Sequence, residues 1–175
     1  MELLDLCSLE KWESLENEIR KRTGLNASVY NIEGYRIFPA EHWPNRLCPE
    51  IKAVPKGQSF ICAAAHMNIA LLAKSSKSPV IEECDAGLIK LVVPIFVKEE
   101  FVGAVSGCGM LLDDGEVDTF LVHKMTELDE ALLEELSADL PAISMEQAHE
   151  ISRFIQGQLE QIVADYQKSV SGEGP

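Results

Sequence analysis

Two apolar segments joined by a short charged turn constrain the fold of this chain more than any other feature. Residues 88–97 are rich in β-branched and aliphatic side chains, residues 98–100 are charged, and residues 101–112 return as a second apolar segment. This pattern predicts a β-hairpin. Pro94 in the first segment and the glycines in the second indicate a bulge, an edge or a close approach by a neighbouring group.

Helical and strand patterns surround this hairpin. Four segments carry apolar residues at helical spacing: residues 8–23, 59–74, 118–135 and 144–168. Residues 26–38 predict a second hairpin, and residues 79–83 predict a further short strand. This order favours an α+β fold with an antiparallel sheet of about five strands, helices on one face and a long C-terminal helix. Such an arrangement resembles the PAS/GAF-like architecture.

The division of the chain follows from the same pattern. Residues 1–143 are expected to form one domain, with residues 39–58 as a proline-rich loop across the sheet. Residues 144–175 are expected to form a C-terminal helix and a frayed tail. The apolar stripe over residues 144–168 either packs on the domain or pairs with a second copy, so we expect an output helix or a homodimer contact there.

The charge balance excludes several function classes. A net charge of −14 argues against nucleic acid and against an anionic membrane surface as partners. No segment approaches the ~20 apolar residues of a membrane span, and the first residues lack the basic and apolar regions of an export signal. We therefore expect a cytoplasmic protein, in which five cysteines are metal ligands, reactive thiols or core residues.

The cysteines give the strongest chemical hypothesis. Cys48, Cys62 and Cys84 lie in one segment, and His66 follows Cys62 by four residues, which places both on one face of a helix. Three thiolates and one imidazole can form a tetrahedral zinc site. Cys108 is the alternative fourth ligand, and four cysteines would suit an iron-sulfur cluster, with haem the least favoured cofactor. Buried thiols lining an apolar pocket and reversibly paired redox thiols remain open.

Other residue types add little catalytic signal. Tyr30, Trp43 and Cys108 are candidate ligand contacts in a pocket, although aromatic residues in such places usually pack. The sequence has no phosphate loop, hydrolase elbow or dinucleotide fingerprint. A nucleophilic pair of Cys62 and His66 would need an oxyanion hole and an orienting group that the sequence does not provide. We therefore expect no enzymatic activity.

The cysteine spacing and the hairpin together resemble the PocR sensory domain over roughly residues 8–112. The matching positions are Cys48, Cys62, Cys84, Gly87, Leu88, Pro94, Ile95, Gly103 and Gly107. The resemblance implies a PAS-like ligand-binding domain of prokaryotic signal transduction that senses small hydrocarbon derivatives such as diols. The chain departs from the family pattern at Cys108 and Gly109, and it carries no recognisable output domain.

Three function hypotheses follow. The first is a sensor that binds a small-molecule ligand, or holds a metal or cluster, in a pocket beneath residues 48–84 and signals to an output protein through its C-terminal helix. The second is a redox-active cysteine protein or a small enzyme. The third is an interaction module whose fold is stabilised by a structural zinc site.

Overall fold

A four-stranded antiparallel sheet forms the centre of the molecule. The computed structural model describes residues 1–38 and 42–171; residues 39–41 of the predicted loop and residues 172–175 of the predicted tail lie outside the described residues. The strand order is β1-β4-β3-β2. The strands are β1 (Asn26–Asn31), β2 (Val80–Glu83), β3 (Ile89–Val97) and β4 (Glu100–Cys108). The predicted α+β class is confirmed, and the predicted central hairpin is β3 with β4.

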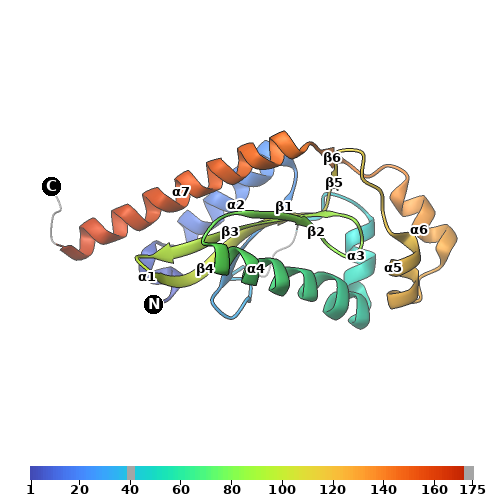
Figure 1. Cartoon of the computed structure of the whole chain (residues 1–175), viewed down its shortest axis with the longest axis horizontal. Coiled ribbons are helices and arrows are strands. Elements are labelled where there is room, and N and C mark those ends of the chain that lie inside the picture. The colour runs from blue at the N-terminus through green and yellow to red at the C-terminus, as the bar shows by residue number, and fades with distance from the viewer. Residues whose placement is uncertain (39–41, 172–175) are drawn as a thin grey trace.

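Helices cover both faces of the sheet (Figure 1). On one face lie α1 (Leu3–Leu6), α2 (Leu9–Thr23) and α7 (Met145–Ser171); on the other lie α3 (Leu47–Ala53), the π-helix η1 (Gly57–Ala63) and α4 (Ala64–Ser76). The sheet thus has four strands rather than about five, and helices on two faces rather than one. The reason is visible in β3, whose first five residues are all buried and therefore need cover on both sides.

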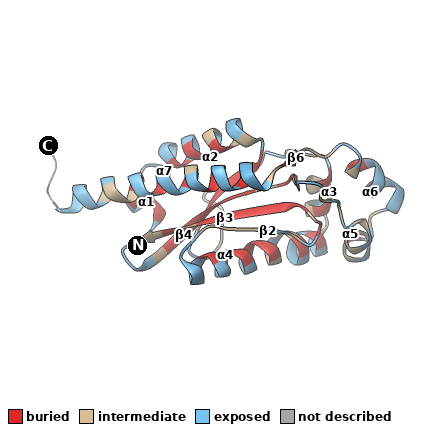
Figure 2. Cartoon of the chain, turned by 45° about the horizontal axis from the view of Figure 1, so that its top comes forward, coloured by how far each residue is buried: buried red, intermediate tan, exposed pale blue. Residues whose placement is uncertain are grey.

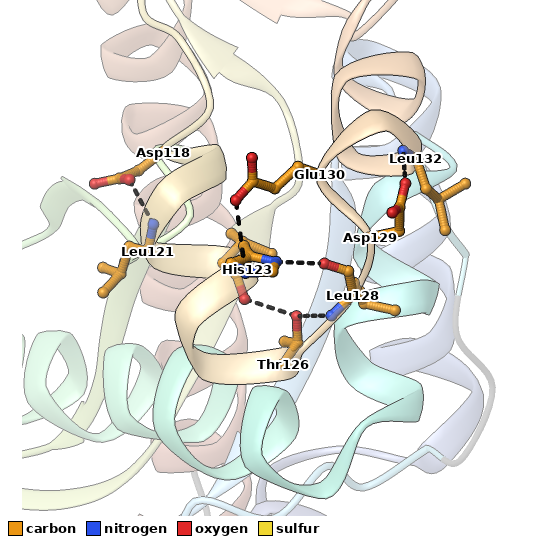
Figure 3. Close-up of polar contacts among 9 residues, drawn as sticks. Asp118, Leu121, His123, Thr126, Leu128, Asp129, Glu130 and Leu132 are labelled. Carbon is orange, nitrogen blue, oxygen red and sulfur yellow. Dashed lines mark hydrogen bonds and ion pairs between the residues drawn. The ribbon is translucent and has the colours of Figure 1, made fainter.

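The predicted helix over residues 118–135 is two helices, α5 (Thr119–Thr126) and α6 (Glu130–Ser137). Asp118 and Asp129 cap their starts by accepting hydrogen bonds from backbone N–H groups at 2.8 and 3.0 Å (Figure 3). Glu127 adopts a left-handed conformation, with φ of 62°, that ends α5. His123 donates from Nδ1 to the Leu128 carbonyl at 2.8 Å, which holds the corner between the two helices.

A second, parallel pair of short strands was not predicted. It joins β5 (Leu111–Leu112) to β6 (Ala142–Ile143), on either side of α5 and α6. This pairing returns the chain to the end of the main sheet, where α7 begins. Ser144 and Gln147 form the predicted capping box at that point, with hydrogen bonds of 3.0 and 3.1 Å.

The main hydrophobic core lies between the sheet and the α1, α2 and α7 layer. Trp12 is fully buried there, and its Nε1 donates to the Leu3 carbonyl at 3.0 Å. The apolar stripe of α7 is buried from Ala148 to Ile162, on the side facing the sheet (Figure 2). Packing within the chain therefore accounts for the stripe, and the homodimer stays a prediction.

Candidate functional site

A cavity of about 550 Å³ lies on the face of the sheet that carries α4. Strands β1, β3 and β4 contribute one wall, and α3, η1 and α4 contribute the other. Cavities of this volume are typical of small-molecule sites. The described side chains that line it are mostly apolar or weakly polar, and the charged ones among those described are Glu33, Arg36, Lys52 and Lys90.

The structure brings all seven candidate residues to this one cavity. They come from five separate parts of the chain: Tyr30, Trp43, Cys48, Cys62, His66, Cys84 and Cys108. Cys7, the fifth cysteine, lies outside the cavity and packs against the main core. That these residues bind a ligand, a metal or a cluster stays a prediction.

The register of the sheet explains why β-strand residues meet there. Cys108 of β4 lies directly opposite Asn26 of β1 and Lys90 of β3. Residues opposite one another in an antiparallel sheet point to the same face. Tyr30 points the same way because it is four residues along β1 from Asn26. Only the first half of the predicted hairpin over residues 26–38 is a strand; Arg36 makes a single bridge back to Tyr30.

The helical wall begins with an unusual element. The predicted helix over residues 59–74 starts earlier, as the seven-residue π-helix η1, and continues directly into α4. A π-helix has hydrogen bonds from i to i+5, is rare, and occurs frequently at functional sites. Cys62 lies in η1 and His66 in α4, so the two are not a simple pair on one face of an α-helix. Cys62 is half-buried, whereas His66 is only 5% exposed.

A side-chain amide ties the loop cysteine to the sheet. Asn45 donates from Nδ2 to the Cys48 Sγ at 3.3 Å and to the Gly109 carbonyl at 2.5 Å. Its Oδ1 accepts from the Cys48 backbone N–H at 2.7 Å. Asn45 therefore fixes α3 against the end of β4, and brings Cys48 towards Cys108.

Three of the cavity cysteines, Cys48, Cys62 and Cys84, are neutral thiols at physiological pH. Burial raises the pKa of Cys48 to about 12 and that of Cys62 to about 11, and it also raises the pKa of Cys84. The pKa of Cys48 is raised further by Cys108, Cys84 and Cys62, so these four groups are close enough to act on one another. A thiol that stays protonated is a poor nucleophile.

The predicted zinc set is not formed. Among residues 1–38 and 42–171, no three His, Cys, Asp or Glu side chains are grouped so that they could hold a metal ion. His66 instead stacks on Tyr30, with ring centroids 3.8 Å apart. The charged groups that act on His66 are Lys90 and Arg36, not the cysteines. The metal site of Cys48, Cys62, Cys84 and His66 is therefore not supported.

His66 should make the protein sensitive to acid. Burial, with Lys90 and Arg36 as further causes, lowers the pKa of His66 to about 3 from 6.5. The folded state then binds fewer protons than the unfolded state below pH 6.5, so stability is complete above that pH and is lost as the pH falls towards 3. Between pH 7 and 4 we expect His66 to cost about 3 kcal/mol of unfolding free energy.

Urea denaturation at stepped pH checks this expectation. His66→Phe keeps a ring against Tyr30 but cannot take up a proton, so its stability should fall less between pH 7 and 4 than that of the wild type. The matched control is His149→Phe, since His149 is exposed on α7. Equal pH slopes for wild type and His66→Phe would contradict the argument.

Three basic residues of the cavity were missed in the sequence. Lys90 is the most informative, because a lysine inside an otherwise apolar strand is unusual, and that signal was available. Arg36 and Lys52 follow no pattern that could have identified them. Arg36 donates from Nε to the Tyr30 hydroxyl at 3.3 Å, and the Lys52 ammonium lies 5.4 Å from the centre of the Trp43 ring.

The comparison with protein families shows to which family the chain belongs. The model of the sensory domain found in PocR matches residues 5–166, nearly the whole chain. The chain belongs to the PocR sensory-domain family. The PocR match extends from α1 into α7, and so includes the sheet, the cavity and most of the C-terminal helix. No curated protein and no solved structure gave a match.

Membership of the PocR family indicates a signalling role, because the family is one of sensory domains. Across the part of this PocR domain that the structure describes, no helix is both long and apolar enough to cross a membrane.

Proposed function

We propose that this chain is a non-enzymatic sensor that binds a small, largely apolar molecule in the cavity between the sheet and the α3–η1–α4 wall. The observation that carries the proposal is the cavity itself, which has the volume of a small-molecule site and is lined by residues such as Ala65, Leu88 and Ile89. Its position is the one that the sequence predicted for a ligand pocket.

The alternative of a thiol enzyme or redox protein has less support. A thiol whose pKa is about 11, as at Cys62, is rarely deprotonated at neutral pH. His66, whose pKa is about 3, is too weak a base to remove that proton. Cys62 and His66 therefore lack the properties of an activated nucleophile and its base.

The proposed output is a change in α7, read by a partner protein. α7 packs on β3, and β3 also contributes Lys90 to the cavity wall. A ligand that favours one position of this strand would favour one position of the helix. The proposed setting is the cytoplasm, where five free cysteines are expected to persist.

Filling the cavity tests the ligand-sensing proposal. Short-chain alcohols, diols and carboxylates are screened by thermal unfolding, because a ligand that binds only the folded state raises the midpoint. Ala63 lines the cavity but is itself exposed, so Ala63→Trp should be tolerated and should abolish the shift. Ala131→Trp, on the exposed side of α6, should leave the shift unchanged. A midpoint that no compound raises would count against the proposal.

A second candidate is an iron-sulfur sensor, favoured by the gathering of four cysteines at one cavity. A polynuclear cluster lies between its ligand sulfurs and so needs them farther apart than a single ion does. Anaerobic reconstitution, with iron and sulfide analysis and a visible absorbance spectrum, tests it. Cys108→Ser should then lose the cluster, and Cys7→Ser should retain it. A colourless, iron-free protein after reconstitution would exclude this candidate.

A further inference from the structure

Lys90 is a buried cation in the middle of the sheet. It is 6% exposed and lines the cavity. No hydrogen bond or ion pair joins it to any residue in the described ranges 1–38 and 42–171. Glu82 lies opposite Lys90 across β2 and β3, yet it is exposed and forms no ion pair with it. Among the residues that the structure describes, the ammonium of Lys90 therefore has no hydrogen-bond acceptor.

Such an arrangement is unfavourable without a counter-charge. Burial of an unpaired ammonium carries a large desolvation penalty. The one contact that offsets it is a cation–π interaction with Tyr30, whose ring centre lies 5.6 Å from the Lys90 Nζ. Burial is the largest single influence and lowers the pKa of Lys90, whereas Cys108 and Tyr30 raise it, and the net direction is upward.

The described residues that line the cavity include more basic side chains than acidic ones, although the whole protein carries a net charge of −14. Arg36 and Lys52 have interaction partners of their own, so Lys90 is the cation on which the argument depends. Lys90 and Arg36 both act on His66 and, after burial, lower its pKa, so the Lys90 ammonium lies near this ring at the cavity wall. A cavity of this kind attracts an anion.

We propose that the cavity binds a small monocarboxylate, with its carboxylate on the Lys90 ammonium and its hydrocarbon chain along the apolar wall. This inference rests on the ligand-sensing function proposed above and adds the chemical class of the ligand. One ammonium without an acceptor is balanced by one negative charge. The apolar wall provides no surface for a fully hydrated ion such as phosphate, but it suits a short alkyl chain.

Matched pairs of compounds test the proposal by calorimetric titration of the full chain. Lactate and propane-1,2-diol share one carbon skeleton, and so do butyrate and butan-1-ol; within each pair, only the first carries a carboxylate. We expect the carboxylate of a pair to bind at least about tenfold more tightly than the alcohol, which corresponds to about 1.4 kcal/mol. Added salt should weaken binding of the carboxylates only.

Two lysine variants separate a specific contact from general charge. Lys90→Met should weaken carboxylate binding at least about tenfold and leave alcohol binding unchanged. Lys74→Met is the matched control, because Lys74 also lies over an aromatic ring, that of Phe101 at 5.1 Å, but does not line the cavity. If Lys90→Met does not fold, Lys90→Arg keeps the charge and should retain carboxylate binding.

The outcomes distinguish this inference from the function on which it rests. The inference is overturned if the alcohols bind as tightly as the matching carboxylates. It is also overturned if Lys90→Met weakens carboxylate binding no more than Lys74→Met does. In both cases the proposal of a ligand-binding cavity would stand. Loss of carboxylate binding in Lys90→Arg, with the fold intact, would also overturn it. If neither member of either pair binds, both proposals fail.

Discussion

Replacing Trp12 with alanine should lower the free energy of unfolding by about 3–5 kcal/mol. The indole is fully buried in the main core and its N–H donates to the Leu3 carbonyl, so the substitution leaves both a cavity and an unpaired carbonyl. The measurement is urea denaturation followed by circular dichroism, with the midpoint and slope compared between variants.

Trp43→Ala is the control for this first prediction. Trp43 is 36% exposed, and the Lys52 ammonium lies over its ring. Its removal should cost less than about 1 kcal/mol. Similar losses for the two tryptophans would contradict the assignment of Trp12 to the core and of Trp43 to the cavity wall.

Gly87→Ala should destabilise the protein by about 2–4 kcal/mol. Gly87 has a φ of +80°, and a Cβ added there would lie 2.2 Å from the Glu116 carbonyl oxygen. The turn that contains it is held by a hydrogen bond from the Gly87 N–H to the Cys84 carbonyl at 2.8 Å. The substitution should therefore lower the stability of the fold and also disturb the turn that positions Cys84 at the cavity. Thermal unfolding and binding of a cavity ligand would both be measured.

A glycine in an open helical position gives the opposite expectation. A Cβ at Gly157 of α7 would meet nothing within 4 Å, so Gly157→Ala should stabilise the protein by up to about 1 kcal/mol. A neutral effect at Gly87 together with a loss at Gly157 would contradict the backbone conformations described above.

Local signals predicted those elements whose ends are fixed by the chain itself. α2 begins with Ser8, whose Oγ accepts from the Lys11 N–H, and ends at Gly24 with a φ of +79°. The start of α7 was equally clear from Ser144 and Gln147. In these places a side chain or a glycine satisfies the helix end within a few residues, so tertiary contacts are not needed to identify it.

Elements that depend on distant contacts were not predicted. The parallel pairing of β5 with β6 joins residues about thirty positions apart. The break at Glu127 places a non-glycine residue at positive φ, which the sequence pattern does not signal. The π-helix η1 has an ordinary helical sequence, and only its packing beside the cavity distinguishes it.

Residue chemistry identified many of the side chains that line the cavity, but not how they are arranged, and their role in binding stays a prediction. Four of the five cysteines line the cavity, together with His66, Tyr30 and Trp43. Spacing alone paired Cys62 with His66, whereas the structure stacks His66 on Tyr30. In the sequence, Lys90 was visible only as a charged residue that interrupts an apolar strand. Its position at the cavity was missed because the strand pattern does not show which face of the sheet a residue meets.

The alternation of side chains along β3 has a mechanical consequence. Lys90 faces the cavity, and its neighbour Leu91, fully buried, faces the core that contains Ile155 and Leu159 of α7. Lys90 and Leu91 are joined by one peptide bond and point to opposite faces of the sheet, so a movement of the Lys90 backbone also moves Leu91. Interiors are close-packed and have little room to absorb such a displacement. The cavity and the core beside α7 therefore meet at two adjacent residues of one strand, and we expect a ligand that displaces Lys90 to displace the part of α7 that packs in the same core as Leu91.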